Sequence, residues 1–175
     1  MPKPRKMLGD WREPYIQSLM RLIETQSKVT IANWCIAYAE ENILPIFEKT
    51  YPGDTRPRAA IAAARDWLDA KIKLPVPKKM ILNCHAAARE AEPNPAAQAA
   101  ARAVGQSAAT IHAPTHSLGL AFYGAAAIAY DCIGIGAQPE VYEKIAAEEC
   151  AKMETALSAV AVENEPNPAK INWNC

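Results

Sequence analysis

Apolar residues recur along most of this chain at intervals of three and four positions, the spacing of one face of an α-helix. Proline at a first helical position, or Ser, Thr, Asp or Asn just before it, marks several expected helix starts. No stretch alternates β-branched or aromatic residues with polar ones as a strand does. The pattern predicts seven helices, over residues 14–26, 28–42, 57–72, 78–92, 95–112, 118–131 and 140–162.

Proline is expected to interrupt this pattern in two places. Pro45 should break or kink the second helix and leave Ile46 and Phe47 in a short extra turn. The Leu-Pro-Val-Pro segment at residues 74–77 should form a connector.

Residues 103–130 contain no Lys, Arg, Asp or Glu, although 22% of the chain is charged. Pro114 divides this stretch into the end of one helix and an apolar helix that begins near Leu118. The apolar run that ends at Tyr130 is shorter than the roughly 20 residues of a membrane span, so it is interpreted as a core helix. The sequence therefore predicts an all-α, single-domain bundle of about seven helices around a buried Ala/Gly-rich central hairpin.

The two ends of the chain differ from this helical body. Residues 1–12 are basic and contain two prolines, which predicts a flexible N-terminal tail. Residues 13–175 should form the single helical domain, with a C-terminal tail docked through Ile171 and Trp173. The N-terminus lacks the apolar run of a secretory signal, and the five cysteines are widely spaced, so a cytoplasmic protein with reduced thiols is expected.

Charge and motifs exclude several classes of function. Lys and Arg together number 19, as do Asp and Glu, so no net field draws the chain toward nucleic acid or an anionic membrane. Glycine-rich phosphate loops, nucleophile elbows, HExxH motifs and paired acid–base carboxylates are missing from the sequence. We therefore expect no catalytic residue, no cofactor, no nucleic acid and no membrane partner.

His112 and His116 are separated by four positions, the interval at which one helix face can offer two imidazoles to a metal. Pro114 lies between them and disfavours a helical conformation at the residue before it. The alternative interpretation is that both histidines satisfy backbone groups at the helix ends on either side of Pro114.

Two further groups of polar residues are distinctive. Asp54, Arg56 and Arg58 lie at an expected helix start, where positive charge is unfavourable unless it is compensated. The two arginines should pair with carboxylates such as Glu40, Glu41 or Glu48, or else contact an anion or an acidic partner. A polar row recurs every four residues along the fifth expected helix, formed by Gln98, Arg102, Gln106 and Thr110.

Several segments together resemble the helical immunity proteins of bacterial and archaeal toxin–immunity systems. The resemblance covers about residues 18–175. Its most distinctive part is the Asp-x-Arg-x-Arg pattern at residues 54–58, followed by 60–63 and Trp67. The other matching segments are Trp34, 37–40, 43–48, 97–102, 109–116, 119–126 and 167–175. The resemblance implies a non-enzymatic cytoplasmic protein that binds and blocks a cognate toxin. Interfaces of that kind use charge complementarity and aromatic or Arg anchors, which makes the candidate partner-binding residues Asp54, Arg56, Arg58, Trp67, Arg102 and Tyr123.

Two alternatives belong to other classes of function. The first is a helical enzyme or ligand-binding domain with a pocket at the Pro114 break, formed by His112, His116 and Arg102. The second is a scaffold that assembles as a homo-oligomer and has no foreign partner.

Overall fold

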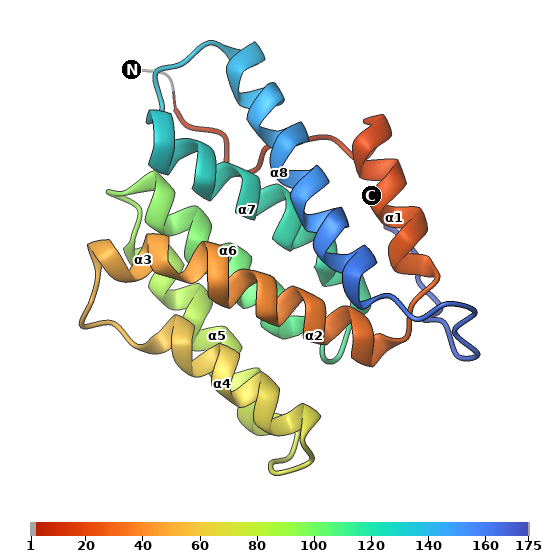
Figure 1. The fold of residues 1–175 in the computed structure, drawn as a ribbon. Helices are drawn as coiled ribbons and strands as arrows, with labels where there is room; N and C mark the ends of the chain where they lie inside the picture. Colours follow the sequence, from red (N-terminus) through yellow and green to blue (C-terminus); the bar gives the residue numbers. More distant parts are fainter. Residues whose placement is uncertain (1–2, 175) are drawn as a thin grey trace.

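The computed structural model describes residues 3–174 (Figure 1). Within this range it contains eight α-helices, one π-helical segment and one 3-10 turn, and no strand. The α-helices are α1 (Pro14–Glu24), α2 (Lys28–Tyr38), α3 (Leu44–Thr50), α4 (Arg56–Leu68), α5 (Pro75–Glu90), α6 (Pro95–Ala109), α7 (Ser117–Ile133) and α8 (Pro139–Val160). Because α2, the π-helical segment (Ala39–Ile43) and α3 follow one another directly, they form one rod. The described chain is thus an all-α bundle of seven rods, as the sequence predicts.

Helices α6 and α7 form the hairpin at the centre of the bundle, joined through the 3-10 turn (Pro114–His116). Most of their Ala and Gly residues are buried, and several are fully inaccessible to solvent. Short side chains let the two helix axes approach closely, which accounts for the Ala-rich composition of this part of the chain. The predicted central hairpin is confirmed. In the described range, none of the helices combines the length and the apolar character that crossing a bilayer requires.

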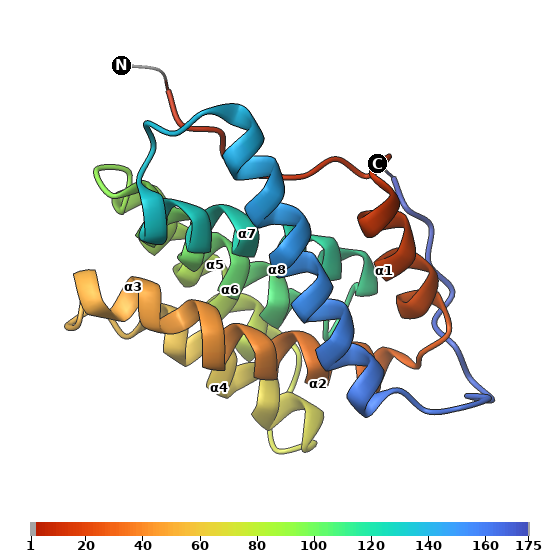
Figure 2. The same ribbon diagram turned by 45° about the horizontal axis from the view of Figure 1, so that its top comes forward.

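The remaining helices cover this hairpin on different sides (Figures 1 and 2). Helix α5 packs on α6, and α4 packs on both. The rod formed by α2 and α3 lies across α6, and α8 packs against α7 and α2. Helix α1 packs on the outer side of α8. The core is therefore continuous from α1 through α8 and α7 to α6.

The rod passes Pro45 without the predicted break. Proline has no N–H, so an α-helical hydrogen bond to the carbonyl four residues earlier is impossible at this position. The chain instead widens into the π-helical segment, in which the N–H of Leu44 donates to the carbonyl of Ala39, five residues earlier. Ile46 and Phe47 are buried in α3, which continues to Thr50.

The connector expected at residues 74–77 is also different in the structure. Helix α5 already begins at Pro75, and Pro77 lies in its first turn. The N–H groups of a first turn have no intrahelical partner, so prolines there cost no hydrogen bond. The helix before it, α4, ends at Leu68 instead of continuing to Ile72, and Ala70 has a positive φ of 59°.

Both ends of the described chain lie against the bundle. Leu8 is only 2% exposed, and its N–H donates to the carbonyl of Phe122 in α7 over 3.1 Å. Leu8 lies two positions after the basic Lys6 and is buried against α7, although residues 1–12 are expected to form a flexible tail. At the other end, the N–H of Ala169 donates to the carbonyl of Gln26 over 2.8 Å. The indole N–H of Trp173 donates to a carboxylate oxygen of Glu24 over 2.6 Å.

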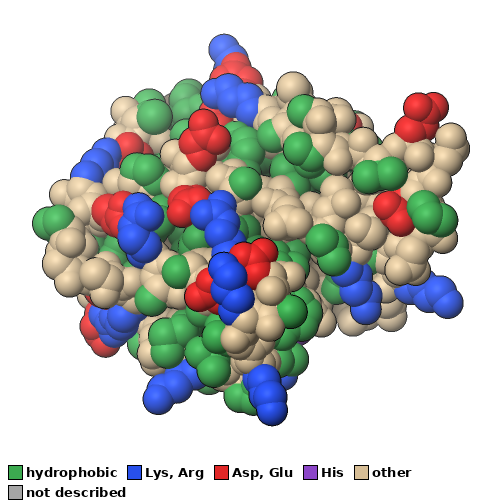
Figure 3. Space-filling view, turned by 60° about the horizontal axis from the view of Figure 1, so that its bottom comes forward, with side chains coloured by type: hydrophobic (Ala, Val, Ile, Leu, Met, Phe, Trp, Pro, Cys, Tyr) green, Lys and Arg blue, Asp and Glu red, His purple; other side chains and the backbone are tan. Residues whose placement is uncertain are grey.

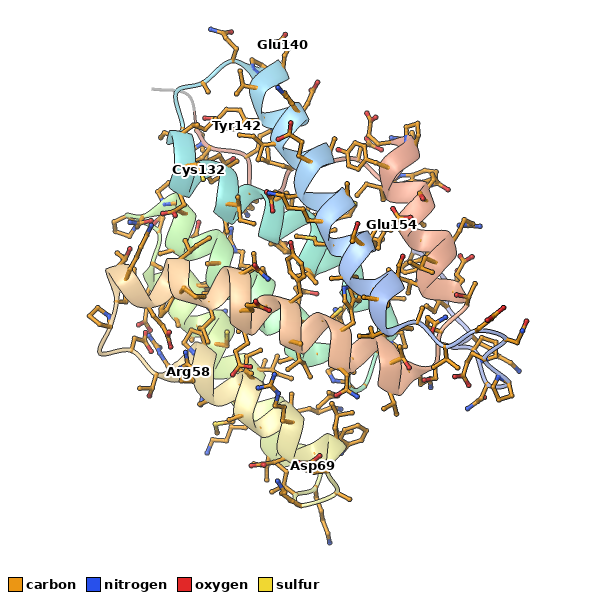
Figure 4. All side chains as sticks on the ribbon, in the orientation of Figure 1. Arg58, Asp69, Cys132, Glu140, Tyr142 and Glu154 are labelled. Atoms are coloured by element: carbon orange, nitrogen blue, oxygen red, sulfur yellow. The ribbon has the colours of Figure 1, made fainter. Side chains whose placement is uncertain are left out.

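Tyr142 fixes the connection between α7 and α8 (Figure 4). Its hydroxyl donates to the carbonyl of Gly134 over 2.7 Å and accepts from the N–H of Ala137 over 3.1 Å. Its ring meets that of Tyr130 edge-on, with 5.6 Å between the ring centroids. The start of α8 is thereby held on the end of α7.

Candidate interaction surface

One side of α5 carries a stripe of residues that no other helix covers completely. Lys78, Leu82, His85 and Arg89 follow one another at intervals of four, three and four residues, so they share one face of the helix. Lys78 and Arg89 are exposed. Leu82 is 68% exposed, the highest value among the large apolar residues that are exposed. This stripe presents an apolar side chain between two cations.

His85 lies over the backbone of α6 at a glycine. A Cβ atom added to Gly105 would lie 2.7 Å from Cε1 of His85, closer than real contacts allow. The imidazole therefore occupies the space that any other residue at position 105 would fill. His85 is held flat across the α5–α6 contact, and it does not extend freely into solvent.

A second glycine performs the same role between α6 and α7. A Cβ atom on Gly119 would lie 2.5 Å from both Cβ and Cγ of Gln106. Gln106 thus lies across α7, where its Oε1 is 2.7 Å from Nδ1 of His116, a hydrogen bond that the Nδ1–H tautomer donates. The rings of His116 and His112 meet edge-on with centroids 5.6 Å apart.

Arg102 completes this surface from the middle of α6. Its guanidinium lies 6.0 Å from the ring centroid of Tyr123 in α7, an arrangement that favours a cation–π contact. We call the surface formed by Lys78, Leu82, His85, Arg89, Arg102, His112 and His116 the cationic face. The candidates Arg102 and Tyr123 and the two histidines at the Pro114 turn are therefore brought together.

Burial lowers the pKa of all three histidines below the usual value of 6.5. For His85, desolvation is the largest cause, followed by the charges of Arg89, His116 and Arg102. For His112, desolvation is followed by the charges of His116 and Lys78. The lowered pKa values favour neutral rings, and the groups other than His116 whose charge acts on His85 and His112 are the cations Arg89, Arg102 and Lys78.

Asp54, Arg56 and Arg58 lie elsewhere, in a network of ion pairs around the start of α4. Arg56 is held by Asp54 at 2.7 Å and by Glu90 of α5 at 2.6 Å. Hydrogen bonds from Arg56 lower the pKa of Asp54 and of Glu90 below their usual values.

Arg58 donates from Nε and Nη2 to the two carboxylate oxygens of Glu48 in α3, over 2.6 and 2.8 Å. Its Nη1 also lies 3.8 Å from Glu40, which pairs in turn with Arg65. Arg58 is labelled at the start of α4 in Figure 4, and Figure 3 shows blue and red groups alternating on this side of the molecule. The compensation expected for the two arginines is thus supplied by carboxylates within the chain, including Glu40 and Glu48.

Trp67 borders a separate, mainly apolar cleft of about 490 Å³. The cleft lies between the start of α2, the end of α4 and the C-terminal tail, and its lining includes Leu68, Ile111, Val29, Lys28 and Lys170. A second hollow, of about 510 Å³, lies between α2 and α8 and is lined by Trp34, Tyr38, Glu41 and Arg65 among others.

No three His, Cys, Asp or Glu side chains within residues 3–174 are grouped in a way that could hold a metal ion. His112 and His116 are close to each other, and the cationic Lys78 also contributes to the lowered pKa of His112.

Four members of the cationic face, Lys78, Leu82, His85 and Arg89, were not among the binding candidates that the sequence suggested. His85 is adjacent to Cys84, but the two point in different directions, and Cys84 is fully buried with its thiol donating to the carbonyl of Ala101. The signal that could have found the stripe is the spacing of Lys78, Leu82 and Arg89, which places an apolar residue among cations on the outer face of a helix.

The fold and its surfaces define a small all-α bundle protein that presents both charged and apolar exposed faces. A model of one protein family matches residues 21–156, and the chain belongs to that family, the Imm-5 like putative immunity proteins. The match includes α2 to α7, most of α8 and every residue of the cationic face. A search of curated proteins and a search of solved structures gave no match.

Proposed function

We propose that this protein binds a cognate toxin and neutralises it without catalysing a reaction. The observation that carries the proposal is the family match over residues 21–156, because immunity proteins act by binding their toxins. The proposal sets the encounter in the cytoplasm of the cell that makes the toxin.

The surface chemistry supports a binding role. Leu82 and Val29 are 68% and 57% exposed, and each lies near unpaired lysines. Exposed apolar residues bordered by charge are typical of protein interfaces. Buried Cys35 and Cys84 have their thiol pKa raised by desolvation, Cys84 to about 12, so neither is a ready nucleophile.

A rescue assay tests the proposal. The reading frame next to this gene is expressed in a bacterial host from an inducible promoter, together with this chain or with the same gene carrying an early stop codon. We expect the neighbour to kill the host with the interrupted gene, and the intact gene to restore growth while its product co-purifies with the neighbour. A lethal neighbour that is not rescued by well-expressed, folded protein would contradict the proposed function.

A further inference from the structure

We propose that the toxin docks on the cationic face and that its docking element is an acidic segment with at least one apolar side chain. This inference rests on the proposed function and adds to it the surface used and the chemistry of the partner. Three observations support it: cations without ion-pair partners in residues 3–174, neighbouring carboxylates that are few and not paired with those cations, and an exposed apolar residue at the centre.

The cations of this face have no ion-pair partner among the residues that the structure describes. Lys78, Arg89 and Arg102 form no ion pair with any group in residues 3–174. The arginines around α4 behave in the opposite way, since Arg56 and Arg58 are each held by carboxylates. The cationic face therefore has unused capacity for ion pairs that a partner can complete.

Two carboxylates follow Arg89 closely in the sequence, and neither forms an ion pair with it in residues 3–174. Glu90 follows Arg89 directly, but its oxygens are held by Arg56 at 2.6 and 3.1 Å. Glu92, three residues beyond Arg89, is exposed. From residue 93 to residue 130 the chain contains no acidic residue at all. The three histidines are neutral or cationic and never negative, so they add no repulsion toward an acidic partner.

Leu82 supplies the apolar contact at the middle of the stripe. Lys78 and Arg89 are separated by eleven residues of α5, which at 1.5 Å per residue is about 16 Å. A helix of about three turns, or an extended segment of about five residues, spans this distance. Its carboxylates would meet the cations at either end, and an apolar side chain between them would cover Leu82.

The face is also prepared in advance for binding. The glycines at 105 and 119 let His85 and Gln106 lie in fixed positions, and Gln106 orients His116. Groups that are already ordered lose little conformational entropy when a partner binds.

The cleft beside Trp67 is the rival surface, because Lys28 and Lys170 border it. It provides a matched control for the experiment. The double variant K78E/R89E reverses two exposed, unpaired cations on the cationic face, and K28E/K170E reverses two beside the cleft. A carboxylate is electrostatically favourable at Lys78, near the start of α5, and unfavourable at Arg89, in its last turn. Because both side chains are exposed, the first variant is expected to fold with little net change in stability.

Affinity for the purified toxin is measured by calorimetry, with its catalytic activity abolished if necessary, alongside rescue of growth. We expect K78E/R89E to weaken binding at least about 100-fold and to lose rescue, and K28E/K170E to change binding less than about threefold. The variant L82D, at an exposed position, should weaken binding to a similar degree with an unchanged circular dichroism spectrum. A carbodiimide, which joins carboxylates to amines, should link Lys78 to an acidic residue of the toxin.

The outcomes separate this inference from the proposed function. Absence of binding by the wild-type chain would contradict both. Wild-type binding that survives K78E/R89E and L82D would overturn only the choice of surface. Loss of binding confined to K28E/K170E would move the interface to the cleft beside Trp67. Cross-links only to lysines outside the cationic face would also contradict the inference.

Discussion

Two glycines determine how the polar residues of the cationic face lie. Helix interiors usually disfavour glycine, because it loses more backbone freedom than alanine when the helix forms. At positions 105 and 119 the missing Cβ makes room for His85 and Gln106. Glycine, although it weakens a helix, occurs here where its missing side chain leaves room for a polar side chain between two closely packed helices.

Replacing Gly119 with alanine should therefore lower the free energy of unfolding. The new Cβ would lie 2.5 Å from Cβ of Gln106, which is fixed to the backbone of α6 and cannot turn away. Overpacking of this kind costs about 1–3 kcal/mol, which exceeds the gain in helix propensity. Urea denaturation measures the change.

The control for this prediction is Gly53→Ala, because nothing lies within 4 Å of a Cβ at that position. Its effect should be within about 0.5 kcal/mol. Equal stabilities for the two alanine variants would show that the α6–α7 contact adjusts freely.

The three histidines predict how stability depends on pH. Each has a pKa below 6.5 in the folded chain, so the unfolded chain binds protons more readily. The free energy of unfolding should therefore be level above about pH 6.5 and should fall as the pH drops below that value. Denaturation at about pH 7.5 and about pH 5.5 measures the difference, a range in which carboxylates and thiols change little.

The variant His85→Gln tests the source of this dependence. It removes a ring whose pKa is lowered by burial and by neighbouring cations, so its stability should fall less between the two pH values. An unchanged slope would assign the effect to other groups.

The contacts of single residues were harder to predict from the sequence than their secondary structure. The polar row of α6 was visible as Arg102 and Gln106 at an interval of four, and the structure places both side chains partly exposed. That His85 would lie against Gly105 was not visible, because it depends on how α5 and α6 are aligned along their lengths. No local pattern specifies that alignment.

At the scale of elements, the ion-pair network joins α4 to the rod that precedes it. Glu40 of the π-helical segment and Glu48 of α3 face Arg58, and Glu40 also pairs with Arg65. These side chains remain 30–51% exposed, so solvent screens the attraction. The network selects the alignment of two helices more than it adds stability.

A double-mutant cycle on Glu48 and Arg58 measures this contribution. Glu48→Gln, Arg58→Gln and the double variant should give a coupling energy of about 0.2–1 kcal/mol. The coupling should shrink in about 1 M NaCl, where the Debye length is about 3 Å. A coupling of several kcal/mol, or one that salt leaves unchanged, would indicate a pair that is far less screened than its exposure suggests.

Helix identities were predictable at this scale, and their ends were less so. The three- and four-residue spacing of apolar residues identified every rod, because a helix that buries one face shows this spacing within its own sequence. The positions of Pro45 and Pro75 were interpreted as interruptions, whereas the chain accommodates the first by a π-helical turn and the second at a helix start. Proline removes one backbone hydrogen bond, and the surrounding packing determines whether the helix ends, kinks or widens at that point.

For the whole molecule, the uncharged stretch at residues 103–130 was the decisive signal. A segment without charge must be buried, and the other helices must surround it, which yields the class of fold directly. The order in which α4, α5 and the rod surround α6 depends on contacts between residues far apart in the sequence, which no local sequence pattern indicates. The net charge of zero likewise does not reveal that Lys78, Arg89 and Arg102 gather on one face without ion-pair partners in residues 3–174.

The π-helical segment changes the directions in which side chains before and after it point from the rod. Each residue advances an α-helix by about 100°, so one residue more or less rotates everything beyond it by that amount. The extra residue between α2 and α3 allows Trp34 to face α8, where its indole N–H donates to the carbonyl of Met153 over 3.0 Å, while Phe47 is buried farther along. A regular α-helix over the same residues would turn Phe47 by about 100° relative to Trp34, whereas deleting a single residue from 39–43 would restore a regular helix with both rings facing the core. The π-helical segment therefore sets the rotation of α3 relative to α2, so that one continuous rod packs against neighbours that lie in different directions.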